Sequence, residues 1–248
     1  MDILTKKKSK GFSKYINDSL GLDVSDKEIE FQLLSKANSF IKSGNLKKAE
    51  EIYRDLISRE MGSYIAYSQL GAILLINSSF DNALENLLKA NALNPKDINT
   101  LINLAKAYRI KGQIDLAIVT YKEILKINPN DFKALDLLGV MSLDKKDYST
   151  SINYLKNSLL INKDYFNSNF NFALVNQQIG NWEIALKYYE NVLRIDPKCH
   201  LAYYNMGEAY NNIGEVNKSI SSYEKCINLK PDYFSAYLNL GVIYNNQM

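Results

Sequence analysis

Apolar residues recur along most of the chain with a period of 34 residues, without insertion or deletion. Within one period, positions 4, 7, 8 and 11 share one face of a helix, and positions 20, 24 and 27 share one face of a second helix. Each period therefore predicts two helices joined by a turn. The units begin at Glu30, Tyr64, Ile98, Phe132, Phe166, His200 and Phe234.

Proline and glycine punctuate this pattern. All four prolines lie at position 32, where they end the second helix, because proline cannot continue it. Glycine at position 15 predicts the turn, and a small residue at position 8 would let the second helix approach closely, opposite a small residue at position 20. Position 17 is assigned to the turn, so Trp182 is expected to pack there rather than to hold a ligand.

A hairpin with apolar residues on more than one face cannot bury them alone, so neighbouring units must stack. The 34-residue hairpin with this signature resembles the tetratricopeptide repeat, over residues 30–248. The resemblance implies an all-α, right-handed superhelical solenoid of antiparallel helix pairs, with six full units and a final single helix. It also implies that the first helix of every unit lines a concave groove.

The two ends depart from the repeat. Residues 1–29 carry Lys6, Lys7, Lys8, Lys10 and Lys14 and predict a basic, flexible tail, with the first ordered helix starting near Ser25 and Glu28. The last helix, from Phe234, carries apolar residues where a capping repeat should be polar. We expect either a fragment of a longer protein or self-association through this end.

The junction of units 4 and 5 is unusually polar. Serine and asparagine take core positions there, and unpartnered buried polar groups would cost about 1–3 kcal/mol each. Either the junction is softer than its neighbours, or it is hydrogen-bonded and of ordinary stability. The residues concerned are Ser142, Ser151, Ser158, Asn169 and Asn176.

Composition excludes several classes of function. A net charge of +3 is too small for a nucleic-acid surface, and no run is long enough to span a membrane. Two cysteines and no apolar leader favour the cytoplasm, and the Asn- and Lys-rich composition favours a bacterial source. His200 stands alone, and no catalytic, metal or phosphate motif is present. We expect no enzyme activity and no cofactor in this chain.

By the same resemblance, positions 2, 5, 6, 9, 12 and 13 of each unit face the groove, and in units 5–7 these are rich in primary amides. A primary amide donates and accepts together, so a row of them suits the main chain of an extended peptide. The row is partly similar to the asparagine ladder of O-GlcNAc-transferase-like superhelices, although asparagine is also common in this chain and family. The candidate groove residues are Asn99, Asn103, Asn167, Asn171, Gln178, Tyr204, Asn205, Asn212 and Asn239.

These features favour a non-catalytic scaffold that binds an extended segment of a partner protein in its groove. The alternative is the substrate-recognition part of a longer glycosyltransferase, sulfotransferase or methyltransferase, because related arrays precede such domains. Self-association through the apolar end is a third hypothesis.

Overall fold

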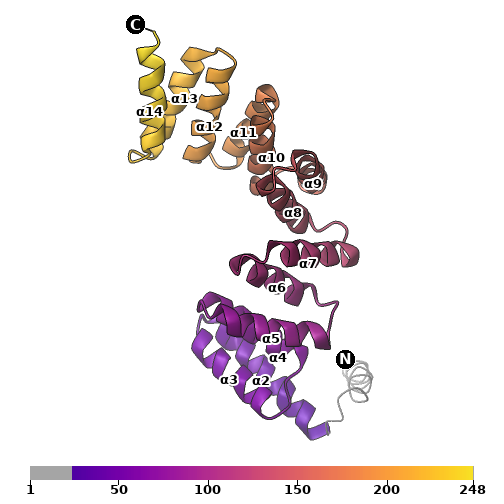
Figure 1. Cartoon of the computed structure of the whole chain (residues 1–248). Helices are drawn as coiled ribbons and strands as arrows, with labels where there is room; N and C mark the ends of the chain where they lie inside the picture. The colour runs from indigo at the N-terminus through magenta and orange to yellow at the C-terminus, as the bar shows by residue number, and fades with distance from the viewer. Residues whose placement is uncertain (1–23, 248) are drawn as a thin grey trace, which may run out of the picture. The chain divides into compact units, whose positions relative to one another are not determined.

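The computed structural model describes residues 24–247, which form thirteen α-helices and no strands (Figure 1). They fall into two compact units, residues 24–120 and 121–247, that divide within α7 (Ile114–Ile127). The first compact unit holds α2 (Val24–Lys42), α3 (Leu46–Ser58), α4 (Tyr64–Ile76), α5 (Phe80–Leu93) and α6 (Ile98–Ile110). The second compact unit holds α8 (Phe132–Asp144), α9 (Tyr148–Ile161), α10 (Phe166–Gln178), α11 (Trp182–Ile195), α12 (His200–Asn212), α13 (Val216–Leu229) and α14 (Phe234–Asn245).

The helices follow the 34-residue period closely. From unit 2 onward, every first helix begins at position 1 of its unit, and the predicted all-α array of helix pairs is confirmed. The prediction that position 17 lies in the turn is wrong, because this position is the first residue of each second helix. Trp182 is accordingly the first residue of α11, and it packs half-buried against the cluster that includes Tyr189 and Ala202.

The first ordered helix starts close to the predicted place. Helix α2 begins at Val24, one residue before Ser25, so residues 24–29, which the predicted tail includes, are helical. The 34-residue spacing sets where a repeat starts, but a helix can extend beyond it. The lysines of the predicted basic tail lie outside the described residues.

Position 15 needs a left-handed backbone. Gly44, Gly112, Gly180 and Gly214 have φ between 72° and 81° there, and the next N–H donates back to the carbonyl of position 11. This bond is the signature of a Schellman turn, in which glycine pays no steric penalty. Units 2 and 4 place Ser78 (φ 59°) and Lys146 (φ 60°) in the same conformation, at a cost that the glycines avoid.

Position 8 is where the two helices of a pair approach most closely. A Cβ atom built on Gly139 would lie 2.5 Å from Cγ of Leu155, and one on Gly207 would lie 2.7 Å from Cε1 of Tyr223. The side chain opposite is thus that of position 24, and not position 20 as the sequence suggested. Position 20 contributes in another way, since Ser151 and Ser219 donate to the carbonyl oxygens of these glycines, at 2.8 and 2.7 Å.

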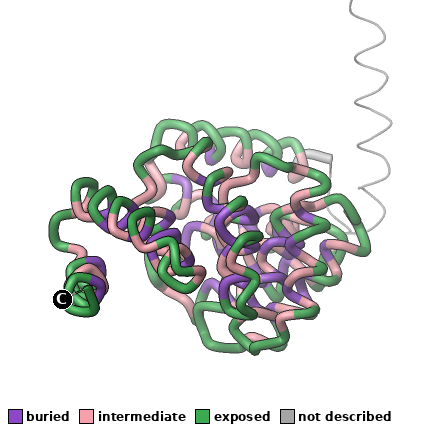
Figure 2. Tube along the Cα trace, turned by 90° about the horizontal axis from the view of Figure 1, so that it is seen from above, coloured by how far each residue is buried: buried purple, intermediate pink, exposed green. Residues whose placement is uncertain are grey.

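The hydrophobic core of each compact unit lies both within the helix pairs and between neighbouring pairs. In the first compact unit it joins α2–α5 through residues such as Tyr53, Leu56 and Leu70. In the second compact unit, Tyr189, Val192 and Met206 join α11 to α12. Figure 2 shows the buried residues (purple) where helices face each other and exposed residues (green) along the turns. Burial between neighbouring pairs is what a single hairpin lacks.

The polar junction of α8, α9 and α10 is hydrogen-bonded. Ser158 donates to the carbonyl of Phe132 at 2.8 Å, and Asn169 donates to the carbonyls of Lys163 and Tyr165. Ser142, Ser151 and Asn176 also donate to main-chain carbonyls. Of these five side chains, only Asn169 leaves a buried atom, its Oδ1, without a partner. These bonds favour the hydrogen-bonded interpretation over the softer one, because the expected cost arises only from unpartnered groups.

Candidate groove surface

The predicted groove residues of units 5–7 lie on α10, α12 and α14, all within the second compact unit. We call the side chains at positions 2, 5, 6, 9, 12 and 13 of these three helices the groove surface. On it, Asn167, Gln178 and Asn212 are exposed, whereas Asn171, Tyr204, Asn205 and Asn239 are half-buried. On α6, in the first compact unit, Asn99 is exposed and Asn103 is half-buried.

The half-buried amides at position 6 bond to the preceding repeat. Nδ2 of Asn239 donates to the phenol oxygens of Tyr223 and Tyr204, at 3.1 and 3.2 Å. Burial raises the pKa of Tyr189 and Tyr223, so both phenols stay protonated. The amide of Asn239 partly offsets this effect at Tyr223, and that of Asn205 does the same at Tyr189. Asn239 therefore ties the last repeat to the one before it, and Asn205 stands in the corresponding place one repeat earlier.

Asn171 is held by a different partner. Its Nδ2 donates at 3.1 Å to Oδ1 of Asp136, which also accepts from the hydroxyl of Ser168 at 2.9 Å. Asp136 is only 2% exposed, and its pKa is raised by this burial and partly lowered again by the two bonds. Ser168 in turn shares a 2.7 Å bond with Ser158, so the network joins α8, α9 and α10.

Glu208 connects α10 and α12 on the groove surface. Its Oε2 accepts from Nε2 of Gln177 at 3.0 Å, and its Oε1 accepts from the phenol of Tyr204 at 3.4 Å. Gln177 is itself buried and accepts from the phenol of Tyr189 at 2.8 Å. With Asn239 on Tyr204, the chain of hydrogen bonds spans α10 to α14. These bonds hold the polar side chains of Gln177, Glu208, Tyr204 and Asn239 in place relative to one another.

Sequence reasoning missed the partners of these amides. The 34-residue pattern places position 24 on the apolar face of the second helix and says nothing of the hydroxyl groups of its tyrosines. A signal was available: Tyr189 and Tyr223 at position 24 are each followed by asparagine at position 6 of the next unit. A buried phenol needs a hydrogen-bond partner, so this pairing predicts a contact between repeats.

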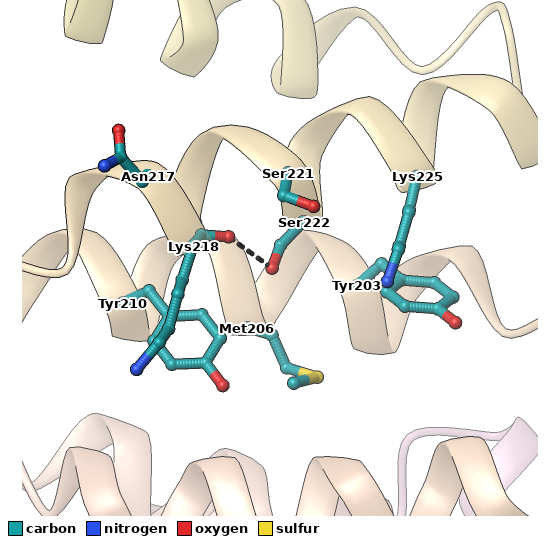
Figure 3. Close-up of a pocket in the computed structure, with 8 residues that line it drawn as sticks. All are labelled: Tyr203, Met206, Tyr210, Asn217, Lys218, Ser221, Ser222 and Lys225. Carbon is teal, nitrogen blue, oxygen red and sulfur yellow. Dashed lines mark hydrogen bonds between the residues drawn. The ribbon is translucent and has the colours of Figure 1, made fainter.

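A shallow depression of about 310 Å³ lies between α12 and α13 (Figure 3). Figure 3 shows its two lysines beside tyrosine rings. Nζ of Lys218 lies 5.6 Å from the centre of the Tyr210 ring, and Nζ of Lys225 lies 5.5 Å from that of Tyr203. Tyr203 and Tyr210 lie on one face of α12, and by helical spacing Glu208 projects from a different face. The depression is therefore separate from the groove surface, and its cations already have aromatic partners.

The remaining reactive side chains do not form a cluster. Within residues 24–247, no group of His, Cys, Asp and Glu could hold a metal ion. Cys199 and Cys226 are both free thiols, and burial raises the pKa of each. His200 packs edge-on against the ring of Tyr233, 5.4 Å away. No helix in this part of the chain is long and apolar enough to cross a bilayer.

Comparison with known protein families identifies the type of repeat. Two tetratricopeptide-repeat models match residues 98–131 and 166–199, which are the third and fifth units of the predicted register, and a TPR-repeat model matches residues 208–247. Stacked antiparallel helix pairs of 34 residues define the class of helical-repeat solenoids. Within that class, this chain is a tetratricopeptide-repeat protein.

Individual relatives agree with this assignment. A TPR repeat-containing protein of Methanocaldococcus jannaschii, MJ1428, is 32% identical over 126 residues, which are 49% of this chain and 22% of that protein. The chain thus matches about a fifth of the length of this curated relative.

Two solved structures show the same fold. Pseudomonas aeruginosa pilF has a TM-score of 0.74 at 16% identity, over 90% of this chain and 99% of its own. YrrB, described as a TPR protein with an unusual peptide-binding site, has a TM-score of 0.64 at 20% identity, over 75% and 95%. At these identities the likeness shows the fold alone, which is the predicted all-α superhelical repeat array.

Proposed function

We propose that this chain is a non-catalytic interaction scaffold whose groove surface binds an extended segment of a partner protein. The observation that carries the proposal is the hydrogen-bonded row from Gln177 through Glu208 and Tyr204 to Asn239, which holds polar groups in place across three helices. Order before binding lowers the entropy cost of association. YrrB, with its reported peptide-binding site, shares the fold and supports the same role here.

The exposed amides beside this row are the groups that a peptide could reach. Asn167, Gln178 and Asn212 are exposed on α10 and α12. Asn167 donates to Tyr165 and Asn212 to the main chain of Glu208, both close by in the chain, and their amide oxygens can still accept. Asn171 and Asn239 instead bond to the preceding repeat, so replacing them would alter stability as well as binding. The exposed set therefore gives the cleaner test of function.

The test is selection from a displayed library of random nonapeptides. The wild-type protein should enrich specific peptides, and the triple variant Asn167→Ala, Gln178→Ala, Asn212→Ala should lose them with little change in melting temperature. A matched control replaces three exposed amides of second helices, Asn153, Asn157 and Asn228, by alanine. No enrichment, or enrichment that survives in the groove variant, would overturn the proposal.

A second proposal is self-association through α14. This helix exposes an apolar stripe at intervals of four residues, with Phe234 76%, Leu238 69% and Val242 58% exposed. Contiguous exposed apolar patches mark interaction sites, and a second copy offers the same stripe. Leu238 and Val242 also belong to the groove surface, so the test uses Phe234, which does not. The variant Phe234→Lys should weaken any self-association seen by light scattering, while Leu160→Lys on α9 should not. A wild-type monomer throughout the micromolar range would contradict this proposal.

Cytoplasmic location, a bacterial source and the role as part of a longer enzyme stay predictions from the sequence. The partial similarity to the O-GlcNAc-transferase groove also stays a prediction.

A further inference from the structure

The groove surface carries a single charge. The groove surface comprises six positions in each of units 5–7, which makes eighteen residues. Glu208 is the only Asp, Glu, Lys, Arg or His among them; the others are amides, apolar residues, a serine and a tyrosine. Glu208 is half-buried on α12, in the middle of the three helices. A ligand that lies along this surface must therefore meet one carboxylate near its centre.

This carboxylate has no cationic partner. None of the ion pairs among residues 24–247 involves Glu208. Its two bonds come from a neutral amide and a neutral phenol, and the second is long at 3.4 Å. An ionised carboxylate has about four acceptor sites, so capacity for further donors remains. A partly buried and unneutralised charge favours a ligand that brings the opposite charge.

The groups around Glu208 suit a flat cation. The ring of Tyr204, bonded to Glu208, is half-buried and lies 5.1 Å from the ring of Tyr233 and 5.7 Å from that of Tyr223. Guanidinium groups stack on aromatic faces and form paired hydrogen bonds with a carboxylate, whereas an ammonium group is a compact, strongly hydrated point charge. The combination of carboxylate and tyrosine rings therefore favours arginine over lysine.

We propose that Glu208 receives the guanidinium group of an arginine in the bound segment, so that the partner is an extended peptide carrying arginine. This inference rests on the proposed function of the groove surface. Glu208 would set specificity through charge, and the amides would hold the peptide main chain with little regard for its sequence. A purely structural Glu208, bridging α10 and α12 alone, would impose no such requirement on the ligand.

The same nonapeptide library tests the inference. Peptides enriched by the wild-type protein should carry arginine at one fixed position, and the Glu208→Gln variant, which keeps an acceptor oxygen for Gln177, should lose that requirement. Glu224→Gln removes an exposed carboxylate from α13 and serves as the matched control. Enriched peptides without arginine would overturn this inference and leave the groove proposal standing. No enrichment by folded protein would overturn both.

An enriched peptide then allows a direct measurement by fluorescence polarisation. Replacing its arginine by citrulline, which is neutral and nearly the same shape, should weaken binding to the wild-type protein by about tenfold or more, as for a buried charge pair. With Glu208→Gln, the same replacement should change affinity by less than about threefold. Equal losses in the two proteins would show that the arginine is bound elsewhere, contrary to the proposal.

Discussion

The side-chain amide of Asn239 donates to the phenol oxygen of Tyr223, 3.1 Å away, and so fastens α14 to α13 of the preceding repeat. Asn205 holds the corresponding position beside Tyr189 one repeat earlier, where burial raises the pKa of that phenol and the Asn205 amide partly lowers it again. An asparagine that the sequence assigns to a groove thus also serves the packing of neighbouring repeats. Stability and the proposed binding would therefore depend on the same residues, and experiments must separate the two.

Removal of one phenol hydroxyl tests this role. Tyr189 is fully buried and donates to Gln177 at 2.8 Å. We expect Tyr189→Phe to lower the free energy of unfolding by about 1–3 kcal/mol, because the buried amide oxygen of Gln177 loses its donor. Urea denaturation measures the change. Tyr237→Phe, at a side chain 47% exposed, is the control and should stay within about 0.5 kcal/mol of the wild type.

An added methyl group at position 8 tests the close approach of paired helices. In Gly139→Ala the new Cβ would lie 2.5 Å from Cγ of Leu155, so α8 and α9 must separate or Leu155 must leave its rotamer. We expect a loss of about 1–3 kcal/mol from this overpacking.

Gly241 provides the matched control for that substitution. It holds the same position in α14, but nothing lies within 4 Å of a Cβ built there. Gly241→Ala should therefore be neutral, or stabilise by up to about 1 kcal/mol through helix propensity. Equal effects of the two substitutions in thermal denaturation would contradict the close-approach explanation.

The left-handed residue of unit 4 offers a gain in stability. Lys146 has φ 60°, whereas four other units place glycine at this position. Lys146→Gly should raise the free energy of unfolding by roughly 0.5–1 kcal/mol, since relief of a strain of about 1–2 kcal/mol exceeds the greater chain entropy of glycine. The reverse change in unit 3, Gly112→Lys, should destabilise the protein. A melting temperature lowered by Lys146→Gly would argue against strain at this turn.

Asp136 predicts a pH dependence of stability. Burial raises its pKa in the folded state, so between its ordinary pKa and the raised value the folded protein binds more protons than the unfolded chain. The contribution of Asp136 to stability is therefore full below the unfolded pKa and is lost as pH rises through the folded pKa. Asp136→Asn stays neutral and keeps an oxygen that can accept from Asn171 and Ser168.

Unfolding in urea across the acidic to neutral range measures this effect. The stability of Asp136→Asn relative to the wild type should increase as pH rises, because only the wild type must ionise a buried group. Asp232→Asn, at an exposed carboxyl, should show no such trend. A difference between Asp136→Asn and the wild type that is the same at every pH would contradict the raised pKa.

Much of the fold was readable from the chain. The period of 34 residues located the starts of α4, α6, α8, α10, α12 and α14, because each local signal repeats and reinforces the others. Proline after the second helix and glycine in the turn act through the backbone of a few adjacent residues. Such effects depend on local geometry, and sequence shows them directly.

The interpretation failed where side chains meet across the repeats. Position 20 was chosen as the partner of position 8, yet the closest side chain to Gly139 and Gly207 is that of position 24. The start of α2 at Val24 agrees with the capping signal at Ser25, although the repeat register itself begins only at Glu30. The period of a repeat specifies neither the side-chain contacts between helices nor how far a helix extends beyond its unit.

The architecture of stacked helix pairs follows from the amino-acid sequence alone, because hydrophobic spacing and turn residues leave the backbone few alternatives. The roles of the polar residues emerge only from the folded arrangement. Asn171 donates to Asp136 and Asn239 to Tyr223, while no ion pair within residues 24–247 reaches Glu208. Such contacts depend on distances between side chains of different repeats. Those distances follow from how one pair packs on the next, and no single repeat encodes them.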